Sequence, residues 1–355
     1  MGIDKIFWNE KKVLITGNTG FKGSWLGLWL SELGADIKGF SDKEFENNLY
    51  SINKTIDTTI GDIRNYSEID KCISEFQPDI IFHLAAQPLV RESYKDPSKT
   101  YSVNLMGTLN LYEAVLKQQK KIFIVTATTD KVYKNLEQIW GYKENDRLCG
   151  TDPYSNSKSC TELLSYSYLH SFFINSPHKI YVARAGNVIG GGDWSDDRLI
   201  PDIIRSINNK KEVFLRNPES TRPWQHVLEP LYGYLKIVEK FYNEEQEKEP
   251  YFNFGPNYEE CITVKETTEL MINNFPENRT NILLDASNNT ALKESKLLFL
   301  DCTKSKHILN WHPINSTRQA VELTAEWYRT FLEKKDILNL SIQQIDDYID
   351  RINEG

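Results

Sequence analysis

Tyr154 and Lys158 are the pair of residues whose types and spacing most directly suggest catalysis. They stand four positions apart, so both side chains lie on one face if the segment is helical. A neighbouring ammonium favours the phenolate and lowers the pKa of a tyrosine toward neutrality, as a general base requires. Because such a pair also arises by chance on helix surfaces, its interpretation depends on its surroundings.

Thr129, Asp130 and Lys131 stand just beyond the predicted strand of residues 121–126. In open α/β sheets, ligands bind outside the carboxyl ends of the strands. A hydroxyl, a carboxyl and an ammonium at that edge could act on a bound molecule together with the tyrosine and lysine. We therefore predict one acid–base set made of these five residues.

A glycine-rich turn follows the short apolar strand of residues 12–16 and precedes a predicted helix over 24–33. Its spacing is G-x-x-G-x-x-G. The first glycine permits a tight turn, the second lets a pyrophosphate approach the backbone, and the third allows close packing of helix on strand. The helix N-terminus offers free N–H groups to phosphates. The cofactor-binding residues predicted here are Gly17, Thr19, Gly20, Phe21, Lys22 and Gly23.

The end of the second predicted strand indicates which dinucleotide is bound. Asp42 supplies the carboxylate that binds the 2′-hydroxyl of NAD, and no arginine stands beside it to suit a 2′-phosphate. Lys43 is the one neighbouring residue that favours the cofactor with a 2′-phosphate. We predict NAD. The further cofactor contacts predicted along the chain are Asp62, Ile63, Ala85, Ala86, Gln87, Tyr154 and Lys158.

Apolar strand runs alternate with helical segments up to about residue 185. This pattern predicts an α/β protein with a doubly wound, Rossmann-type parallel sheet covered on both faces. We place the NAD-binding domain at 1–185 and a smaller mixed α/β substrate-binding portion at 186–355, with some chain crossing back. The later segments include a predicted helix over 259–274.

Composition excludes several classes of function. The net charge of −8 leaves no basic stripe to neutralise phosphates, so no nucleic-acid partner is expected. Five cysteines without metal-like spacing predict free thiols and no metal site. No targeting segment is evident, nor an apolar run of about 18 residues. We expect a soluble cytoplasmic protein with no membrane partner.

These motifs resemble those of the extended short-chain dehydrogenase/reductase family, and within it the nucleotide-sugar 4,6-dehydratases. The likeness lies in the glycine turn, in the segment His83–Gln87 and in the tyrosine–lysine pair. Where dTDP-glucose dehydratases have Thr-Asp-Glu-Val-Tyr, this chain has Thr129–Tyr133, with Lys131 in place of glutamate. That version, with the segment Thr221–Val227, is similar to members that act on CDP-glucose.

The resemblance implies a mechanism. Tyr154, held by Lys158 and assisted by Thr129, takes the proton of the sugar 4-hydroxyl while hydride passes to NAD. Asp130 protonates the departing 6-hydroxyl, and hydride returns to C6. The base that removes the C5 proton stays open. Lys131 could act as a neutral amine, could stay charged and stabilise the enolate, or could merely pair with the aspartate.

Substrate contacts are expected beyond the sixth strand. Arg222 is the best candidate for a phosphate because its planar fork matches phosphate oxygens. Asn187 resembles a family contact to the sugar diphosphate. Trp194 and Trp224 could stack on a ligand or belong to the core, and the choice of nucleotide base rests on resemblance alone. The predicted substrate-binding residues are Asn187, Arg198, Leu199, Arg205, Arg216 and Arg222.

Two other functions would use part of this motif set. A nucleotide-sugar 4-epimerase of the same fold needs the tyrosine, the lysine and NAD, but no acid–base pair for C5 and C6. A non-catalytic NAD-binding sensor needs only the glycine turn. Dimerisation is usual for the fold that this resemblance implies. We therefore expect a homodimer or higher homo-oligomer, formed through the helices that hold residues 107–118 and 157–175.

Overall fold

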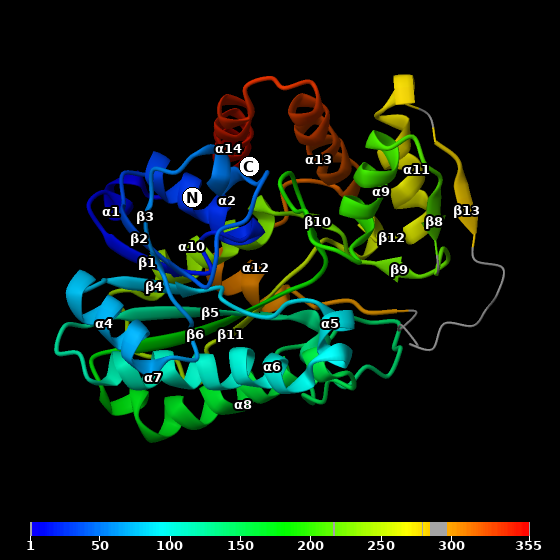
Figure 1. Cartoon of the computed structure of the whole chain (residues 1–355). Helices are drawn as coiled ribbons and strands as arrows, with labels where there is room; N and C mark the ends of the chain where they lie inside the picture. The colour runs from blue at the N-terminus through cyan, green and yellow to red at the C-terminus, as the bar shows by residue number, and fades with distance from the viewer. Residues whose placement is uncertain (1, 216, 279, 285–296, 355) are drawn as a thin grey trace.

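A computed structural model describes residues 2–215, 217–278, 280–284 and 297–354. Its centre is a sheet of seven parallel strands in the order β11-β6-β5-β4-β1-β2-β3 (Figure 1). The strands are β1 (Lys12–Thr16), β2 (Asp36–Ser41), β3 (Asp57–Ile60), β4 (Ile80–His83), β5 (Phe123–Thr129), β6 (Lys179–Ala185) and β11 (Tyr251–Phe254). The order reverses between β1 and β4, so a ligand is expected at the carboxyl ends of these strands. The predicted Rossmann-type sheet is confirmed.

Successive strand residues enter two separate cores, as a sheet covered on both faces requires. Leu14, Ile81 and Ile124 pack with α4 (Tyr66–Phe76), α7 (Gly107–Leu116) and α8 (Pro153–Ser171). Their neighbours along the strands face the opposite core with α2 (Phe21–Glu32) and α10 (Leu228–Phe241). Figure 1 shows α4, α7 and α8 on one side of the sheet.

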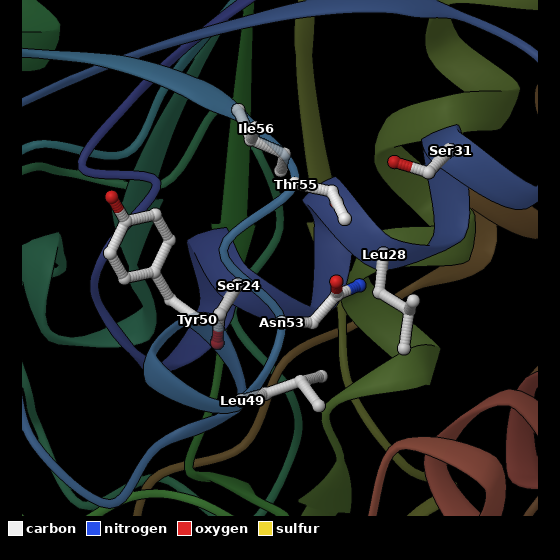
Figure 2. Close-up of a pocket in the computed structure, with 8 residues that line it drawn as sticks. All are labelled: Ser24, Leu28, Ser31, Leu49, Tyr50, Asn53, Thr55 and Ile56. Carbon is white, nitrogen blue, oxygen red and sulfur yellow. The ribbon is translucent and has the colours of Figure 1, made fainter.

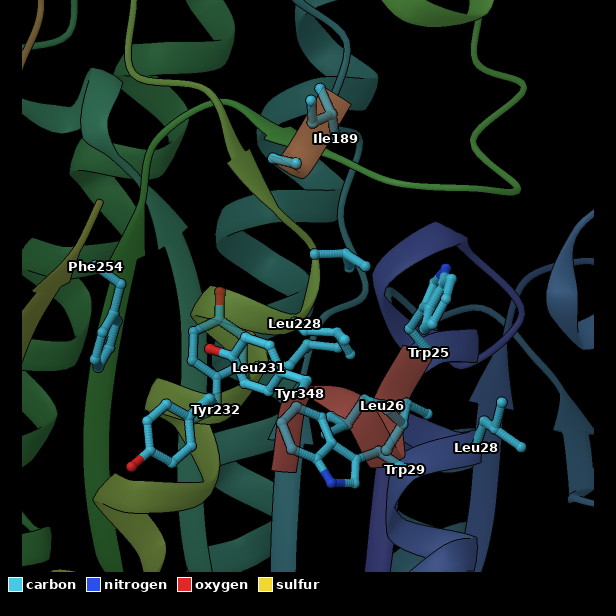
Figure 3. Packing of buried hydrophobic residues seen from close by; sticks show 14 of the residues in the cluster. Trp25, Leu26, Leu28, Trp29, Ile189, Leu228, Leu231, Tyr232, Phe254 and Tyr348 are labelled. Carbon is cyan, nitrogen blue, oxygen red and sulfur yellow. The ribbon is translucent and has the colours of Figure 1, made fainter. Parts of the chain in front are cut away.

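The helix α2 is buried along its length from Gly23 to Leu30, because elements pack around all its sides. A small hollow lies where it meets α3 (Leu49–Ile52) and the segment after it (Figure 2). On another side, Trp25 and Trp29 pack with α10 and with α14 (Ile337–Glu354), as Figure 3 shows. Gly34 follows this helix with a φ of +83°, a left-handed conformation that ends helices and favours glycine.

The second half of the chain both completes the sheet and builds a smaller region beside it. Its α10 and β11 pack on the sheet, so chain does cross back, while the boundary at residue 185 remains a prediction. Three small two-stranded sheets lie in this half: β7 (Val188–Ile189) with β10 (Gln225–His226), β9 (Thr221–Arg222) with β12 (Ile262–Thr263), and β8 (Val213–Leu215) with β13 (Ile282–Leu284). The remaining helices are α1 (Lys5–Trp8), α5 (Val90–Lys95), α6 (Pro97–Tyr101), α9 (Leu199–Asn208), α11 (Val264–Asn273), α12 (Thr303–Leu309) and α13 (Thr317–Leu332).

The helix predicted over 259–274 is shorter in the structure. Thr263 is its N-cap and forms a capping box with Glu266, so α11 begins at Val264 and β12 precedes it. Elsewhere in the described ranges, no helix is both long and apolar enough to span a bilayer.

Candidate active site

The start of α8 positions the predicted catalytic pair. Asp152 caps the helix by accepting a hydrogen bond from the backbone N–H of Ser155 at 2.9 Å, and Pro153 occupies the first turn. Tyr154 and Lys158 therefore lie one helical turn apart on one face, and both are buried. The Nζ of Lys158 donates to the carbonyl oxygen of Ala127 in β5 at 3.2 Å, which fixes the ammonium against the sheet.

The carboxyl end of β5 brings the other predicted groups to the same place. Thr129 Oγ1 donates to Asp130 Oδ1 at 3.0 Å, and a hydrogen bond also joins Thr129 to Tyr154. Lys131 follows in a short 3₁₀ turn, and its charge acts on the carboxyl of Asp130. In the structure, direct contacts thus join Thr129 to Asp130 and Tyr154, and Lys158 lies one helical turn from Tyr154. Lys131, the fifth predicted acid–base residue, lies beside them.

The pKa of Tyr154 differs from the expectation. Burial raises it to about 12, and the charge of Arg198 and the hydrogen bond with Thr129 oppose that rise. We expected Lys158 to lower the pKa of Tyr154 toward neutrality. In the protein without ligands this expectation is wrong, because burial raises the pKa more than the nearby cations lower it. Burial also lowers the pKa of Lys158 to about 8.

Asp130 has an environment that favours the protonated form of its carboxyl. Only 1 % of its surface is exposed, and burial raises its pKa, although Lys131, Thr129, Arg222 and Lys22 oppose the shift. Its Oδ2 has no hydrogen-bond partner within the part of the chain that the structure describes. A buried, protonated carboxyl with a free oxygen can donate a proton to a bound molecule.

The glycine turn has the shape that a dinucleotide diphosphate needs. A Cβ on Gly17 would stand 2.8 Å from the backbone nitrogen of Ala85, and one on Gly23 only 2.1 Å from the carbonyl oxygen of Gly17. A Cβ on Gly20 would meet nothing within 4 Å except that oxygen at 3.3 Å, so the space above Gly20 is open. Because Gly20 has no side chain to cap α2, the first backbone N–H groups of that helix can bind phosphate. These residues fit NAD.

Two of the residues predicted in the turn have contacts of their own. Thr19 Oγ1 donates to the carbonyl oxygen of Lys43 at 2.7 Å, which ties the turn to the end of β2. Lys22 faces the acid–base residues: burial, Arg198 and Lys158 lower its pKa to about 7, and Asp130 and Asp193 oppose this. Lys22 is therefore part of the catalytic region as well as of the turn. Phe21 faces Gly190.

The residues predicted around the adenosine are only partly brought together. Asp42 is exposed, and its charge acts on Arg64, which sequence reasoning missed. Arg64 Nε donates to Asp62 at 3.0 Å, so this carboxylate already has an ion-pair partner. Ile63 is buried and packs on Gly107.

The loop after β4 is held by a residue that the sequence analysis did not select. The backbone N–H of Gln87 donates to Asn104 Oδ1 at 2.8 Å, and the Gln87 side chain donates to Thr100 at 2.8 Å. Asn104 lies in a π-helical turn, Ser102–Met106, and also donates to Ser157 of α8 at 2.9 Å. It thereby ties the loop that carries Ala85, Ala86 and Gln87 to the helix that carries the catalytic pair. A π-helical turn is common at functional sites, but nothing in the local sequence announces it.

The predicted substrate contacts separate into two groups. Arg198 lies at the N-cap of α9, donates to Asp193 at 2.9 Å, and its charge acts on Tyr154. Arg222 donates to the carbonyl oxygen of Thr221 at 2.9 Å, and its charge acts on Asp130. Both arginines therefore border the acid–base residues.

The other predicted substrate residues lie elsewhere or have other partners. Arg205 donates to the backbone oxygens of Trp194 and Ser195, each at 3.1 Å, and so supports a loop. Leu199 is the first residue of α9, and the Asn187 carbonyl accepts from the N–H of Gln225 at 3.0 Å. Arg216 lies outside the described residues.

Trp194, Trp224 and His83 lie in positions where their contacts are with other parts of the fold. Trp194 Nε1 donates to the carbonyl oxygen of Asn47 at 2.6 Å, and its ring meets that of Tyr328 edge to face. Trp224 is buried. His83 bridges the hydroxyls of Thr16 and Thr108, and burial lowers its pKa to about 3. In the ranges described, no cluster of three potential metal ligands occurs.

Comparison with known proteins shows the family to which the chain belongs. The family described as GDP-mannose 4,6 dehydratase matches residues 14–324. The CDP-glucose 4,6-dehydratase of Salmonella typhimurium is 44% identical over 98% of this chain and 98% of its own length. The chain belongs to the nucleotide-sugar 4,6-dehydratase family. A less similar relative is the CDP-paratose 2-epimerase of Salmonella typhi, which is 26% identical over 89% of this chain and 98% of its own length.

Solved structures share the fold. The epimerase Mth375 of Methanothermobacter thermautotrophicus superposes with a TM-score of 0.81 at 23% identity, covering 93% of this chain and 95% of that one. The dTDP-glucose 4,6-dehydratase of Bacillus anthracis, solved in complex with NAD, superposes with a TM-score of 0.74 at 22% identity, covering 92% of this chain and 99% of that one. These likenesses confirm the fold that the dehydratase family uses.

Proposed function

We propose that this protein is a NAD-dependent CDP-glucose 4,6-dehydratase, which converts CDP-D-glucose to CDP-4-keto-6-deoxy-D-glucose with loss of one water. The observation that carries the proposal is Asp130, a buried carboxyl of raised pKa in hydrogen-bond contact with Thr129 and beside Tyr154. An epimerase that acts only at C4 has no use for such an acid. The 44% identity to a CDP-glucose 4,6-dehydratase over nearly the whole chain supports the same reaction and the same sugar nucleotide.

NAD, held by the backbone around Gly20, would supply a reversible hydride acceptor for oxidation at C4 of the sugar and for the later reduction at C6. Tyr154 removes the proton of the 4-hydroxyl, with its oxygen oriented by Thr129. The 4-ketone acidifies the proton on C5. When that proton leaves, the C5–C6 double bond forms as the C6–O bond breaks, and Asp130 donates the proton that makes the departing hydroxyl water. A proton returned to C5 completes the product.

The group that removes the C5 proton follows from the position of Lys131. We propose that Lys131 faces the sugar beside Asp130, because it is the next residue in the chain and its charge acts on that carboxyl. As a neutral amine it takes the C5 proton, and as an ammonium it would stabilise the enolate instead. The rate of exchange of the C5 proton with solvent in Lys131→Arg separates the two roles, because arginine keeps the positive charge but cannot act as the base.

The cofactor and substrate contacts are also proposals. We assign the diphosphate of NAD to the backbone around Gly20, and the adenosine 2′-hydroxyl to Asp42. Arg198 and Arg222 are assigned to the substrate diphosphate, since both guanidinium groups border the acid–base residues. Arg205 contributes through the loop that it supports.

We further propose a homodimer in the cytoplasm. Leu163, Tyr166 and Phe172 on α8 are half exposed although they are large and apolar, and Met106 is exposed beside α7. Helices α7 and α8 form the outer layer on their side of the sheet (Figure 1). A second copy packed on this layer would bury these side chains. Sedimentation of the wild type against Leu163→Glu tests this, and a monomer in both would contradict it.

The function is tested by product analysis. The purified protein is incubated with NAD and, in parallel, with CDP-, dTDP-, GDP- and UDP-glucose. The products are analysed by mass spectrometry for loss of water, and the recovered sugars are analysed for isomers. Loss of one water from CDP-glucose with no net reduced nicotinamide is the expected result. Isomerisation without loss of mass would instead show an epimerase, and no change with any substrate would contradict the proposal.

A further inference from the structure

Glu162 lies behind the catalytic pair and was not predicted to matter. It follows Lys158 by four residues on α8, so both side chains lie on the same face of the helix, and none of its surface is exposed. Its Oε1 accepts a hydrogen bond from Thr128 Oγ1 at 2.6 Å and from Arg184 Nε at 3.0 Å. Its Oε2 accepts from the same Nε at 2.8 Å and from Nη2 of Arg184.

Arg184 completes the arrangement from β6. Its guanidinium is 1 % exposed, and Nη1 donates to Tyr133 Oη at 2.6 Å and to the carbonyl oxygen of Glu144 at 2.8 Å. Its Cζ stands 5.0 Å from the ring centre of Tyr133 and 5.1 Å from that of Tyr251. The Glu162–Arg184 pair therefore links α8 to β5, β6 and β11 at one point.

A buried ion pair of this kind needs an explanation other than stability. Removing two charges from water costs about as much as their attraction returns, and apolar residues of equal volume often stabilise a fold as well or better. The pair instead stands where position matters. Thr128 immediately precedes Thr129, and Lys158 is one turn before Glu162, so the pair contacts both elements that carry the acid–base groups.

The charge of Glu162 also has a specific target. The charged and titratable groups that face Lys158 are Glu162 and Tyr154 on α8, Lys22 on α2 and His83 on β4. Lys22 opposes a positive charge on Lys158, whereas Glu162 supports one. Burial lowers the pKa of Lys158, and Glu162 counteracts that effect.

We propose that Glu162, clamped by Arg184, is a positioning residue for the Tyr154–Lys158 pair: it holds α8 in register against the end of β5 and keeps Lys158 charged. Proton removal by the tyrosine then starts beside an ammonium rather than a neutral amine. This role deepens the proposed function and rests on it for the identity of the reaction.

The test is the pH dependence of C4 oxidation in Glu162→Gln, followed by reduced-nicotinamide absorbance in a single turnover with CDP-glucose. Lys158 with a pKa of about 8 is charged below that pH and loses its charge above it. Removing the carboxylate lowers this pKa further, by about one unit for the loss of a neighbouring opposite charge. The alkaline limb of the profile should therefore move to lower pH, and the rate at pH 8 should fall about fivefold, because the charged fraction of Lys158 drops from about a half to about a tenth. A folded variant whose limb stays in place overturns the proposal.

Three further variants separate position from charge. Arg184→Lys keeps the Glu162 carboxylate, so its rate should fall while its alkaline limb stays where the wild type has it. Glu162→Gln with Arg184→Gln leaves no unpaired charge, so it should fold if the single variant does not, and its limb should still move. Glu239→Gln is the matched control. This carboxylate on α10 is also ion-paired, to Lys236, and its side chain is only 9% exposed, but it contacts Trp8 away from the acid–base residues, so its profile should be unchanged.

A second readout does not depend on turnover. The pKa of Lys158 is about 8 in the folded state and near 10.5 when the chain is unfolded, so the unfolded state binds more protons between these values. This residue therefore makes the protein more stable as pH rises through that window. In the double Gln variant the rise should begin at lower pH, and Lys158→Met should lack it. If the wild type converts no nucleotide sugar, the proposed function fails, while this comparison still decides whether Glu162 sets the charge of Lys158.

Discussion

Two regions border the candidate active site and are built differently. The catalytic floor, which consists of Thr128–Asp130 with Tyr154, Lys158 and Glu162, is buried, and its polar groups bond to one another. The cover consists of residues 190–198 with the start of α9. Ion pairs at its outer edge are open to solvent: the side chains of Arg91 and Asp197 are 39% and 35% exposed.

Residues 190–193 of the cover are buried, whereas residues 196 and 197 form its exposed outer edge. Trp25 Nε1 donates to the carbonyl oxygen of Gly191 at 2.9 Å, and a Cβ on Gly191 would stand 1.9 Å from the ring of Trp327. Exposed ion pairs contribute little stability, so the outer edge can separate from α5 at low cost. The comparison indicates that the predicted acid–base groups are held by buried hydrogen bonds, whereas the outer edge of the cover is held by solvent-exposed ones.

The strongest way to break the floor is Tyr154→Phe. The fold should persist, because the change removes one hydroxyl, but turnover should fall by about 10³-fold as the base is lost. Steady-state kinetics with CDP-glucose measures this. Tyr232→Phe is the matched control, since it removes a hydroxyl from another buried tyrosine, one whose ring packs against Tyr348 of α14, and it should keep wild-type turnover. Similar rates for the two variants would remove Tyr154 from the mechanism.

Asp130→Asn should stop the reaction later. C4 oxidation remains. Water loss should slow by about 10²-fold, because the asparagine amide cannot replace the proton that the Asp130 carboxyl, whose pKa is raised, would donate. Reduced nicotinamide should accumulate and be visible by its absorbance after a single addition of substrate. Full turnover without that signal would show that another group is the acid.

The glycine turn permits a test of cofactor binding apart from stability. In Gly23→Ala the new methyl would stand 2.1 Å from the carbonyl oxygen of Gly17, so unfolding should become easier by about 1–3 kcal/mol. In Gly20→Ala the methyl meets only that oxygen at 3.3 Å, so stability should hardly change while NAD binds more weakly. Thermal unfolding and NAD titration by calorimetry separate the two. Equal NAD affinity in Gly20→Ala and wild type would contradict the assigned diphosphate position.

The smallest effect is expected at the outer edge of the cover. Arg91→Gln removes an ion pair that is exposed on both sides, so the free energy of unfolding should change by less than about 1 kcal/mol. The wild-type contribution should also shrink as salt screens it. Chemical denaturation at low and high ionic strength measures both. A loss of several kcal/mol would mean that the cover is held as firmly as the floor.

Several features could be predicted because their signals lie within one short stretch of chain. The apolar run of residues 121–126 became part of β5, the glycine spacing became the turn before α2, and the four-residue step from Tyr154 to Lys158 became one face of α8. The helix predicted over 259–274 was placed too early, since the Thr263 capping box decides where α11 begins.

Other features depend on segments that are distant in sequence. Arg205 carries the same charge as Arg198, yet it supports a loop, and only the packing of α9 shows this. Arg184 and Glu162 carry no local signal, because one stands in a strand and the other in a helix. The raised pKa of Tyr154 comes from burial beneath several elements at once.

The amino-acid sequence by itself determined the fold class and the glycine turn before α2, and it predicted which residues form the acid–base set, because spacing and residue type carry these signals. Only the tertiary structure decided which charges meet: Lys22 beside Lys158, and Glu162 behind it. The physical reason is that electrostatic and desolvation free energies depend on three-dimensional distance and burial, which the order of residues along a chain does not contain.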